Sequence, residues 1–293
     1  MTSPKTSEPG PTVLVGIITH NRAGILQKSI QSALQQSYAH VQVAVVDDAS
    51  IDETAALAAR FPSVRWTRFD SPRGYLEARN LLMRESSADY YLSLDDDAWF
   101  MGADEIAVAI DYLERNRHVA ALALDILSPD RATTADRTAA RPTNTFIGCG
   151  HVLRLNAVRE AGYYTPGPEP YGAEEKDLCL RLRDCGHEVY LMPGVHVWHD
   201  KAEVGRDLRA QQSSNVCNDL AFALRRCPLP LLIVVLPYKV LSHFRYALRH
   251  NLLAQCFRGV GRFLRHFPSG WKHRAPVSAT TFQEFLSRSH SGA

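Results

Sequence analysis

The stretch Tyr90-Tyr91-Leu92-Ser93-Leu94-Asp95-Asp96-Asp97-Ala98 is a short apolar strand that leads directly into three consecutive carboxylates. Adjacent negative charges repel one another, so three of them at the end of a core strand are unfavourable without a counterion. A divalent cation would remove that cost, because Asp95 and Asp97 would point to the same side of a strand and could face one hard cation. The stretch by itself leaves a solvated acidic turn open as the alternative.

Three apolar segments precede this stretch, and each is followed by a turn and a helical pattern. They are predicted as strands over 13–19, 41–46 and 64–69, with helices over about 25–34, 51–60 and 75–85. Residues 50–53 (Ser-Ile-Asp-Glu) have the form of a capping box for the second of these helices. The alternation predicts an α/β fold with a right-handed, doubly wound, mostly parallel sheet and helices on both faces.

Polar side chains gather where these strands end. Ligands of doubly wound sheets bind at the carboxyl ends of the strands. Thr19, Asp47, Asp48 and the three aspartates of 95–97 all fall there. The coincidence favours the cation site over the acidic turn.

The second half of the chain is less regular. It is predicted to contain helices over 104–116 and 174–185, strands over 119–124, 146–155 and 189–192, and loops over 128–145 and 162–172. Gly148 and Gly150 would interrupt the strand over 146–155, at a point where a ligand or another backbone approaches closely.

Composition indicates a soluble globular protein. The 293 residues are enough for a full α/β core, and 45% of them are hydrophobic and 22% charged. The six cysteines form no Cys-x-x-Cys pair, which predicts reduced cytosolic thiols and no zinc site.

Residues 1–12 are polar and predicted to be a flexible leader. The apolar run 229–236 is interrupted by Pro230 and followed by Pro237, so no transmembrane helix is expected.

Positive charge is concentrated near the C-terminus. Residues 220–283 contain ten Lys or Arg and no Asp or Glu, although the net charge of the whole chain is only +2. Apolar residues at helical spacing lie beside these arginines, in one stripe over 241–252 and another over 257–267. Two basic amphipathic helices would suit an anionic membrane surface; the alternative is that they pack on the catalytic body or on a second subunit. No nucleic acid partner is expected, because no recognised binding motif is present.

Five motifs in order resemble family 2 glycosyltransferases of the GT-A fold over about residues 12–200. They are VGIITHNR, VAVVDDASIDET, RGYLEARN, LSLDDD, and YGAEEKDLCLRL followed by VHVWH. The resemblance implies a metal-dependent, inverting transfer of a sugar from a nucleoside diphosphate to an acceptor hydroxyl, with Mn²⁺ or Mg²⁺ as cofactor. Together with the composition, it divides the chain into a leader (1–12), a GT-A catalytic domain (13–220), a basic amphipathic helical arm (221–274) and a polar tail (275–293).

The resemblance also implies roles for residues around the triplet. Asp97 would be the principal metal ligand, acting on the leaving diphosphate, and Asp48 or its neighbour Asp47 would contact the nucleobase. His199 would complete the metal shell, which suits Mn²⁺ somewhat better than Mg²⁺. The other residues on the nucleotide side are Thr19, Arg22, Arg79, Asn80, Asp95 and Asp96.

The general base is expected in the motif Glu174-Glu175-Lys176-Asp177-Leu178. This motif departs from the commonest family form, Glu-Asp-x-Asp-Leu, by having Glu at the second place. Glu175 is the predicted base, and Glu174 replaces it if the alignment slips by one. Asp177 would bind the acceptor or cap the helix; a plain acidic helix N-terminus is the structural alternative.

Two other functions fit parts of the pattern. A nucleotidyltransferase shares the metal carboxylates but would be expected to have a Gly- and Lys-rich loop where this chain has His20-Asn21-Arg22. A non-catalytic sugar-nucleotide-binding protein would lose the base, which the motif over 174–178 retains. The sugar, the nucleotide and the acceptor (a saccharide, a lipid-linked or a small molecule) are not determined. The expected location is cytoplasmic, with the arm placing the protein on the inner face of the membrane if it binds lipid.

Overall fold

The computed structural model describes residues 10–131, 139–200 and 208–290. The chain forms two compact units, and the second is assembled from residues 142–146, 160–189 and 202–293. The boundary expected at residue 220 falls inside a helix, α6 (Leu208–Arg226). Most of the predicted leader and part of the predicted loop over 128–145 lie outside the described residues.

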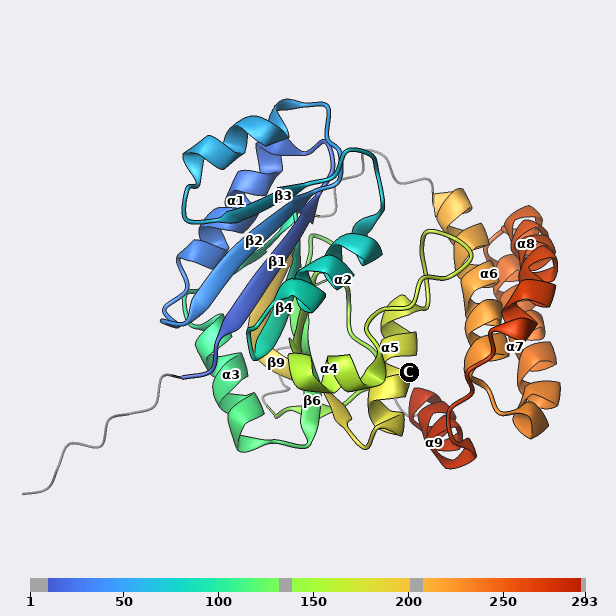
Figure 1. Ribbon diagram of the computed structural model, residues 1–293. Coiled ribbons are helices and arrows are strands. Elements are labelled where there is room, and N and C mark those ends of the chain that lie inside the picture. Colours follow the sequence, from blue (N-terminus) through green and yellow to red (C-terminus); the bar gives the residue numbers. More distant parts are fainter. Residues whose placement is uncertain (1–9, 132–138, 201–207, 291–293) are drawn as a thin grey trace, which may run out of the picture. The chain divides into compact units, whose positions relative to one another are not determined.

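The first unit is built around one mixed sheet with the strand order β3-β2-β1-β4-β8-β6-β9-β5, to which β7 adds by pairing with β9 (Figure 1). The strands are β1 (Val13–Thr19), β2 (Val41–Asp47), β3 (Arg65–Arg68), β4 (Tyr90–Asp95), β5 (Ala98–Phe100), β6 (Val119–Leu127), β7 (Arg141–Pro142), β8 (Gly150–Arg154) and β9 (Glu188–His199). The pairs β1–β2, β1–β4 and β2–β3 are parallel, whereas β8 is antiparallel to both β4 and β6. The α/β class is confirmed, and the four strands that the sequence predicts first pair in parallel.

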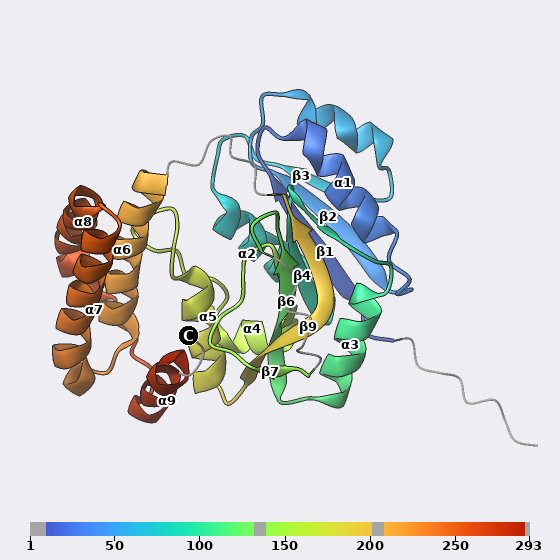
Figure 2. The same ribbon diagram turned by 180° about the vertical axis from the view of Figure 1, so that it is seen from behind.

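Helices cover both faces of this sheet. They are α1 (Ala23–Leu34), the 3-10 helix η1 (Glu53–Arg60), α2 (Tyr75–Glu85), α3 (Glu105–Arg115) and α4 (Leu155–Ala161). The ribbon views show α1 and α3 on one side of the sheet and α2 on the other (Figure 2). In α1 the buried residues Leu26, Ser29, Ile30 and Ala33 form one helical face, which packs on the sheet.

The strand β1 is buried along its whole length, as expected for the middle of a doubly covered sheet. Gly16 lies at its centre, where an added Cβ would come within 2.6 Å of the Tyr91 ring and 2.8 Å of Leu82. Only glycine leaves room for these two side chains. Such packing fixes β1 against β4, the strand that carries the aspartates.

Two local predictions in the first unit are wrong. The helix after β2 is capped by Asp52 instead of Ser50: the Asp52 carboxylate accepts the Thr54 backbone N–H, while the Ser50 hydroxyl accepts the Asn21 backbone N–H. The strand expected over 146–155 starts only at Gly150. Gly150 is approached by the Ile126 side chain, which an added Cβ would meet at 2.2 Å, so a neighbouring side chain explains this glycine.

The second unit is helical. It contains α5 (Glu174–Asp184), α6, α7 (Leu229–Arg249), α8 (Leu253–Lys272) and α9 (Ala279–His290). α6 packs against α7 and α8, and its buried residues form a core with Phe263 of α8 and Phe282 of α9. Residues 275–293, expected to be a polar tail, thus include a helix that buries Phe282 and Phe285.

The arm departs from the sequence prediction at its prolines. α7 runs through Pro237, and Pro230 stands in the first turn, where no backbone N–H is needed. The helix thus continues past Pro237, where the apolar run 229–236 stops. Within the described residues, α7 is the one helix long and apolar enough to cross a membrane, judged by length and composition alone.

Candidate active site

The aspartate triplet lies at the carboxyl edge of the parallel strands. β4 ends at Asp95, and Asp96 and Asp97 form the turn into β5. The register pairs Ile18 with Asp95 and Thr19 with Asp47, so the ends of β1, β2 and β4 meet at this edge. The Ser29 hydroxyl of α1 donates to the carbonyl oxygens of Asp96 (2.9 Å) and Ala98 (2.5 Å) and so fixes the turn.

Two arginines pair with the three carboxylates of the triplet. Arg22 Nη1 donates to Asp97 Oδ2 at 2.7 Å and to Asp96 Oδ1 at 3.1 Å. Arg79 Nη2 donates to Asp95 Oδ1 at 2.7 Å and to the Gly148 carbonyl oxygen at 3.0 Å. Arg22 lies in the β1–α1 loop and Arg79 in α2. The negative charge of the triplet is therefore compensated by two separate elements.

His199 brings an imidazole to the same point. Its Nε2 lies 3.2 Å from Asp97 Oδ1, and the Asp200 backbone N–H donates to the Asp97 carbonyl oxygen at 2.9 Å. His199 is the last residue of β9, which is antiparallel to β5 and pairs His199 with Ala98. The predicted proximity of His199 and Asp97 is present in the structure.

The surroundings shift the pKa of two aspartates in opposite directions. Burial raises the pKa of Asp96 to about 6, an effect that Arg22 only partly offsets. Burial also acts on Asp97, but the hydrogen bonds and charges of His199 and Arg22 outweigh it and hold the Asp97 pKa below its ordinary value. Asp97 is therefore the buried carboxylate that stays ionised.

The donor set fits a hard or borderline divalent cation. One ligand atom each of Asp95, Cys149 and His199 lie within 4.8 Å of one another, and Asp97 adjoins His199. Carboxylate oxygens and an imidazole suit Mn²⁺ or Mg²⁺. Burial, followed by the charge of Asp95, raises the pKa of the Cys149 thiol well above its ordinary value in the metal-free protein.

Cys149 is the site residue that the sequence reasoning missed. It lies 54 positions after Asp95, and it reaches the edge because the segment before β8 folds back beside β4. The only local signal is its place between Gly148 and Gly150.

The remaining predicted nucleotide residues are buried at the same edge of the first unit. Asp47 Oδ1 accepts the Ser50 backbone N–H at 2.8 Å, and Asp48 accepts the backbone N–H groups of Arg73 (2.6 Å) and Gly74 (2.9 Å). Both carboxylates thus hold loops in place. Thr19, at the end of β1, and Asn80, beside Arg79 on α2, are buried as well.

The base candidates belong to the second unit. Glu174 is buried and Glu175 half-buried, both in the first turn of α5. The Asp177 carboxylate accepts from Arg181 Nε at 2.8 Å and from Arg226 Nε at 2.7 Å. The N-cap of α5 is Ala173, so the predicted helix cap at Asp177 is wrong, and the Asp177 carboxylate instead binds two arginines.

Comparison with known proteins identifies the family. The model of "Glycosyl transferase family 2" matches residues 14–160, half of the chain. Among curated proteins, the succinoglycan biosynthesis protein ExoO of Rhizobium meliloti (strain 1021) is 35% identical over 97 residues, which is 32% of this chain and 28% of ExoO. An uncharacterized glycosyltransferase of Haemophilus influenzae is 28% identical over 101 residues, 34% of each chain. Both matches span about a third or less of the relative's length.

Solved structures extend the likeness to the whole chain at the level of fold. The mannosyltransferase PcManGT of Pyrobaculum calidifontis, in complex with GDP-Man and Mn²⁺, has a TM-score of 0.64 at 17% identity, covering 96% of this chain and 80% of that one. S. aureus TarS 1-349 in complex with UDP-GlcNAc has the same TM-score at 12% identity, covering 96% and 92%. The chain thus belongs to glycosyltransferase family 2 and has the GT-A fold.

Proposed function

We propose that this glycosyltransferase uses a divalent cation at Asp97 and His199 to transfer a sugar from a nucleoside diphosphate to an acceptor hydroxyl with inversion. The observation that carries the proposal is the meeting of Asp97, His199 and Asp95 at the carboxyl edge of the sheet. When bound, the cation would stabilise the negative charge of the departing diphosphate. Structural neighbours that hold Mn²⁺ with GDP-Man, or with UDP and GalNAc, support this choice.

The protein's own groups supply the remaining chemistry. Arg22 and Arg79 bring positive charge to the edge where the diphosphate would bind. Glu175 would accept the proton of the acceptor hydroxyl as it attacks the sugar, and Glu174 is the alternative base. Family membership argues against the nucleotidyltransferase and the non-catalytic alternatives.

Donor turnover tests this proposal directly. The protein is incubated with a panel of sugar nucleotides, Mn²⁺ and acceptor fractions, and the released nucleoside diphosphate is measured. Asp97→Asn should abolish metal-dependent donor binding, while Asp111→Asn, on the exposed face of α3, should not. No release with any donor would contradict the proposed reaction.

The base is assigned by a second pair of variants. Glu175→Gln should leave donor binding unchanged and stop transfer, whereas Glu53→Gln, an exposed position in η1, should change neither. Full turnover by Glu175→Gln together with an inactive Glu174→Gln would move the base to Glu174.

We further propose that α7 and α8 contact an anionic bilayer at the cytoplasmic face of a membrane. Ile233 of α7 is 74% exposed, and Phe257 and Leu264 of α8 are 64% and 61% exposed. Arg258 and Arg265 are exposed beside them, and no acidic residue occurs from 220 to 283. Apolar side chains flanked by arginines suit the interface of a negatively charged leaflet. A second subunit covering the same faces is the competing proposal.

A further inference from the structure

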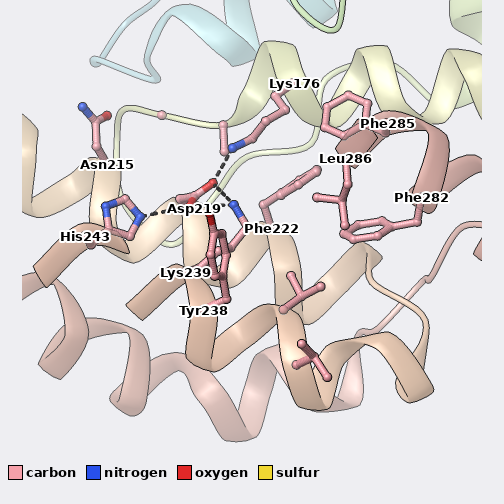
Figure 3. Close-up of a pocket in the computed structure, with 14 residues that line it drawn as sticks. Lys176, Asn215, Asp219, Phe222, Tyr238, Lys239, His243, Phe282, Phe285 and Leu286 are labelled. Atoms are coloured by element: carbon pink, nitrogen blue, oxygen red, sulfur yellow. Dashed lines mark hydrogen bonds and ion pairs between the residues drawn. The ribbon is translucent and has the colours of Figure 1, made fainter. Parts of the chain in front are cut away.

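A cavity of about 740 Å³ lies inside the second unit, between the start of α5 and the helices α6, α7 and α9 (Figure 3). Its apolar walls include Phe222 of α6, Val235 of α7, and Phe282, Phe285 and Leu286 of α9. This volume falls in the range of about 300–1,000 Å³ that small-molecule sites occupy. The cavity is large enough for a ligand with a sizeable apolar part.

One wall of the cavity is charged. Asp219 of α6 is hydrogen-bonded to Lys176 of α5, to Lys239 Nζ at 2.8 and 2.9 Å, and to His243 Nε2 at 2.9 Å. Figure 3 shows the three basic side chains converging on this single carboxylate. The lysine ammonium groups also lie over the ring of Phe222, at 4.8 Å for Lys176 and 6.0 Å for Lys239.

These charges do not balance. Among the lining residues Asp219 is the only acid, so two lysines leave one surplus positive charge even when His243 is neutral. The side chains of Lys239 and Lys176 are 18% and 29% exposed. Partly desolvated charge is unfavourable unless it is paired, and each ammonium group has three donors to satisfy. The two lysines join α5 and α7 to α6, and one carboxylate neutralises only one of them.

We propose that this cavity binds a lipid phosphate, with its anionic head on Lys176 and Lys239 and its apolar chain against the aromatic side chains of α9. The surplus positive charge selects an anion, and the apolar walls select a hydrocarbon chain; a sugar or a free nucleotide would satisfy only part of this lining. We place the mouth of the cavity at Val234 and Tyr238 of α7, two lining residues that are 71% and 56% exposed. A chain can therefore enter from outside the helical unit.

The ligand would be the lipid part of the acceptor, and the attacking hydroxyl would belong to a saccharide joined to that lipid phosphate. This step rests on the proposed function, because Lys176 directly follows the candidate base Glu175 in α5. A head group held by Lys176 would be bound at the same helical turn as the base. The acceptor class would then be lipid-linked instead of a free saccharide or a small molecule.

The inference is tested by measuring the binding of farnesyl phosphate without donor and metal. A negative result would then count against the lipid site alone and not against the proposed sugar transfer. Calorimetric titration below the critical micelle concentration should show binding of farnesyl phosphate at least about tenfold tighter than of farnesol, since a charged hydrogen bond is lost in the alcohol. Inorganic phosphate should compete only weakly, because it lacks the chain.

Two variants locate the site. Lys239→Gln should weaken farnesyl phosphate binding by about tenfold and leave farnesol binding nearly unchanged, whereas Lys272→Gln, an exposed position of α8, should change neither. Val234→Trp, at an exposed position that tolerates a large side chain, should weaken both ligands by blocking the mouth. The proposal is overturned if farnesyl phosphate does not bind, if inorganic phosphate binds as tightly, or if both pocket variants, shown to be folded by circular dichroism, bind like the wild type.

Discussion

Replacing Arg22 by Gln should make the protein bind Mn²⁺ more tightly when no nucleotide is present. Arg22 donates to Asp97 at 2.7 Å and to Asp96 at 3.1 Å, so its guanidinium neutralises the carboxylate that the cation would use. A cation at Asp97 must compete with this partner. Gln removes the competing charge and keeps a hydrogen-bond donor.

The size of the effect follows from the geometry. Two unit charges about 4 Å apart attract by about 4 kcal/mol at an effective dielectric constant of about 20. The Arg22 side chain is 31% exposed and that of Asp97 2%, so solvent screens part of this attraction. Hydrogen bonds to charged groups contribute about 1.5–3 kcal/mol, and the lower end of that range corresponds to about a tenfold gain in Mn²⁺ affinity.

The assay is a titration of free Mn²⁺ followed by electron paramagnetic resonance. Arg68→Gln is the matched control, because Arg68 Nη1 lies 3.3 Å from Asp47 at the same edge of the sheet and carries the same charge. Asp97→Asn should lose binding altogether. If Arg22→Gln binds Mn²⁺ no more tightly than the wild type or Arg68→Gln, the cation does not use the carboxylate that Arg22 holds.

Three further predictions concern packing, pH and the arm. Gly16→Ala should lower the free energy of unfolding by about 1–3 kcal/mol in urea titrations, because its Cβ would overlap Tyr91; an unchanged midpoint would contradict the packing. Burial lowers the pKa of His151 to about 3, below its ordinary value, so the unfolded chain alone binds this proton between pH 6.5 and 3. The contribution of His151 to the free energy of unfolding is therefore fully present above pH 6.5, and it should decrease by about 1.4 kcal/mol for each pH unit below that value. The variant His151→Asn should lack this pH dependence. Flotation with anionic liposomes at low salt should be lost in the double variant Phe257→Asp and Leu264→Asp, and flotation that persists would refute membrane contact through α8.

The parallel half of the sheet could be predicted from sequence because its strands are buried on both faces. The seven residues of β1 and the last five of β2 are all buried. A continuous apolar, β-branched run is the sequence pattern of a strand that is covered on both faces. The polar residues that end these runs mark the edge where ligands bind. The positions of Asp95, Asp96 and Asp97 follow from this local pattern.

The parts that sequence could not predict depend on long-range packing. No neighbouring residue in the sequence indicates that α7 continues through Pro237. The continuation of the helix depends on its contacts with α6. The segment 279–290 reads as polar, yet its two phenylalanines complete the core around Phe222. Cys149 reaches the triplet only through the pairing of β8 with β4.

The structure changes how the triplet is understood, because its three carboxylates are not equivalent. Strand alternation does not extend to Asp97, which lies in the turn after β4, and it faces His199 because β5 pairs with β9. Asp95 is paired with Arg79 and Asp97 with Arg22, so these pairs leave little net charge at the edge without ligands. A divalent cation alone would make it positive and a diphosphate alone negative, whereas the two together restore the balance. Metal and donor are therefore expected to favour each other's binding, with Arg22 as the group that moves from carboxylate to phosphate between the two states.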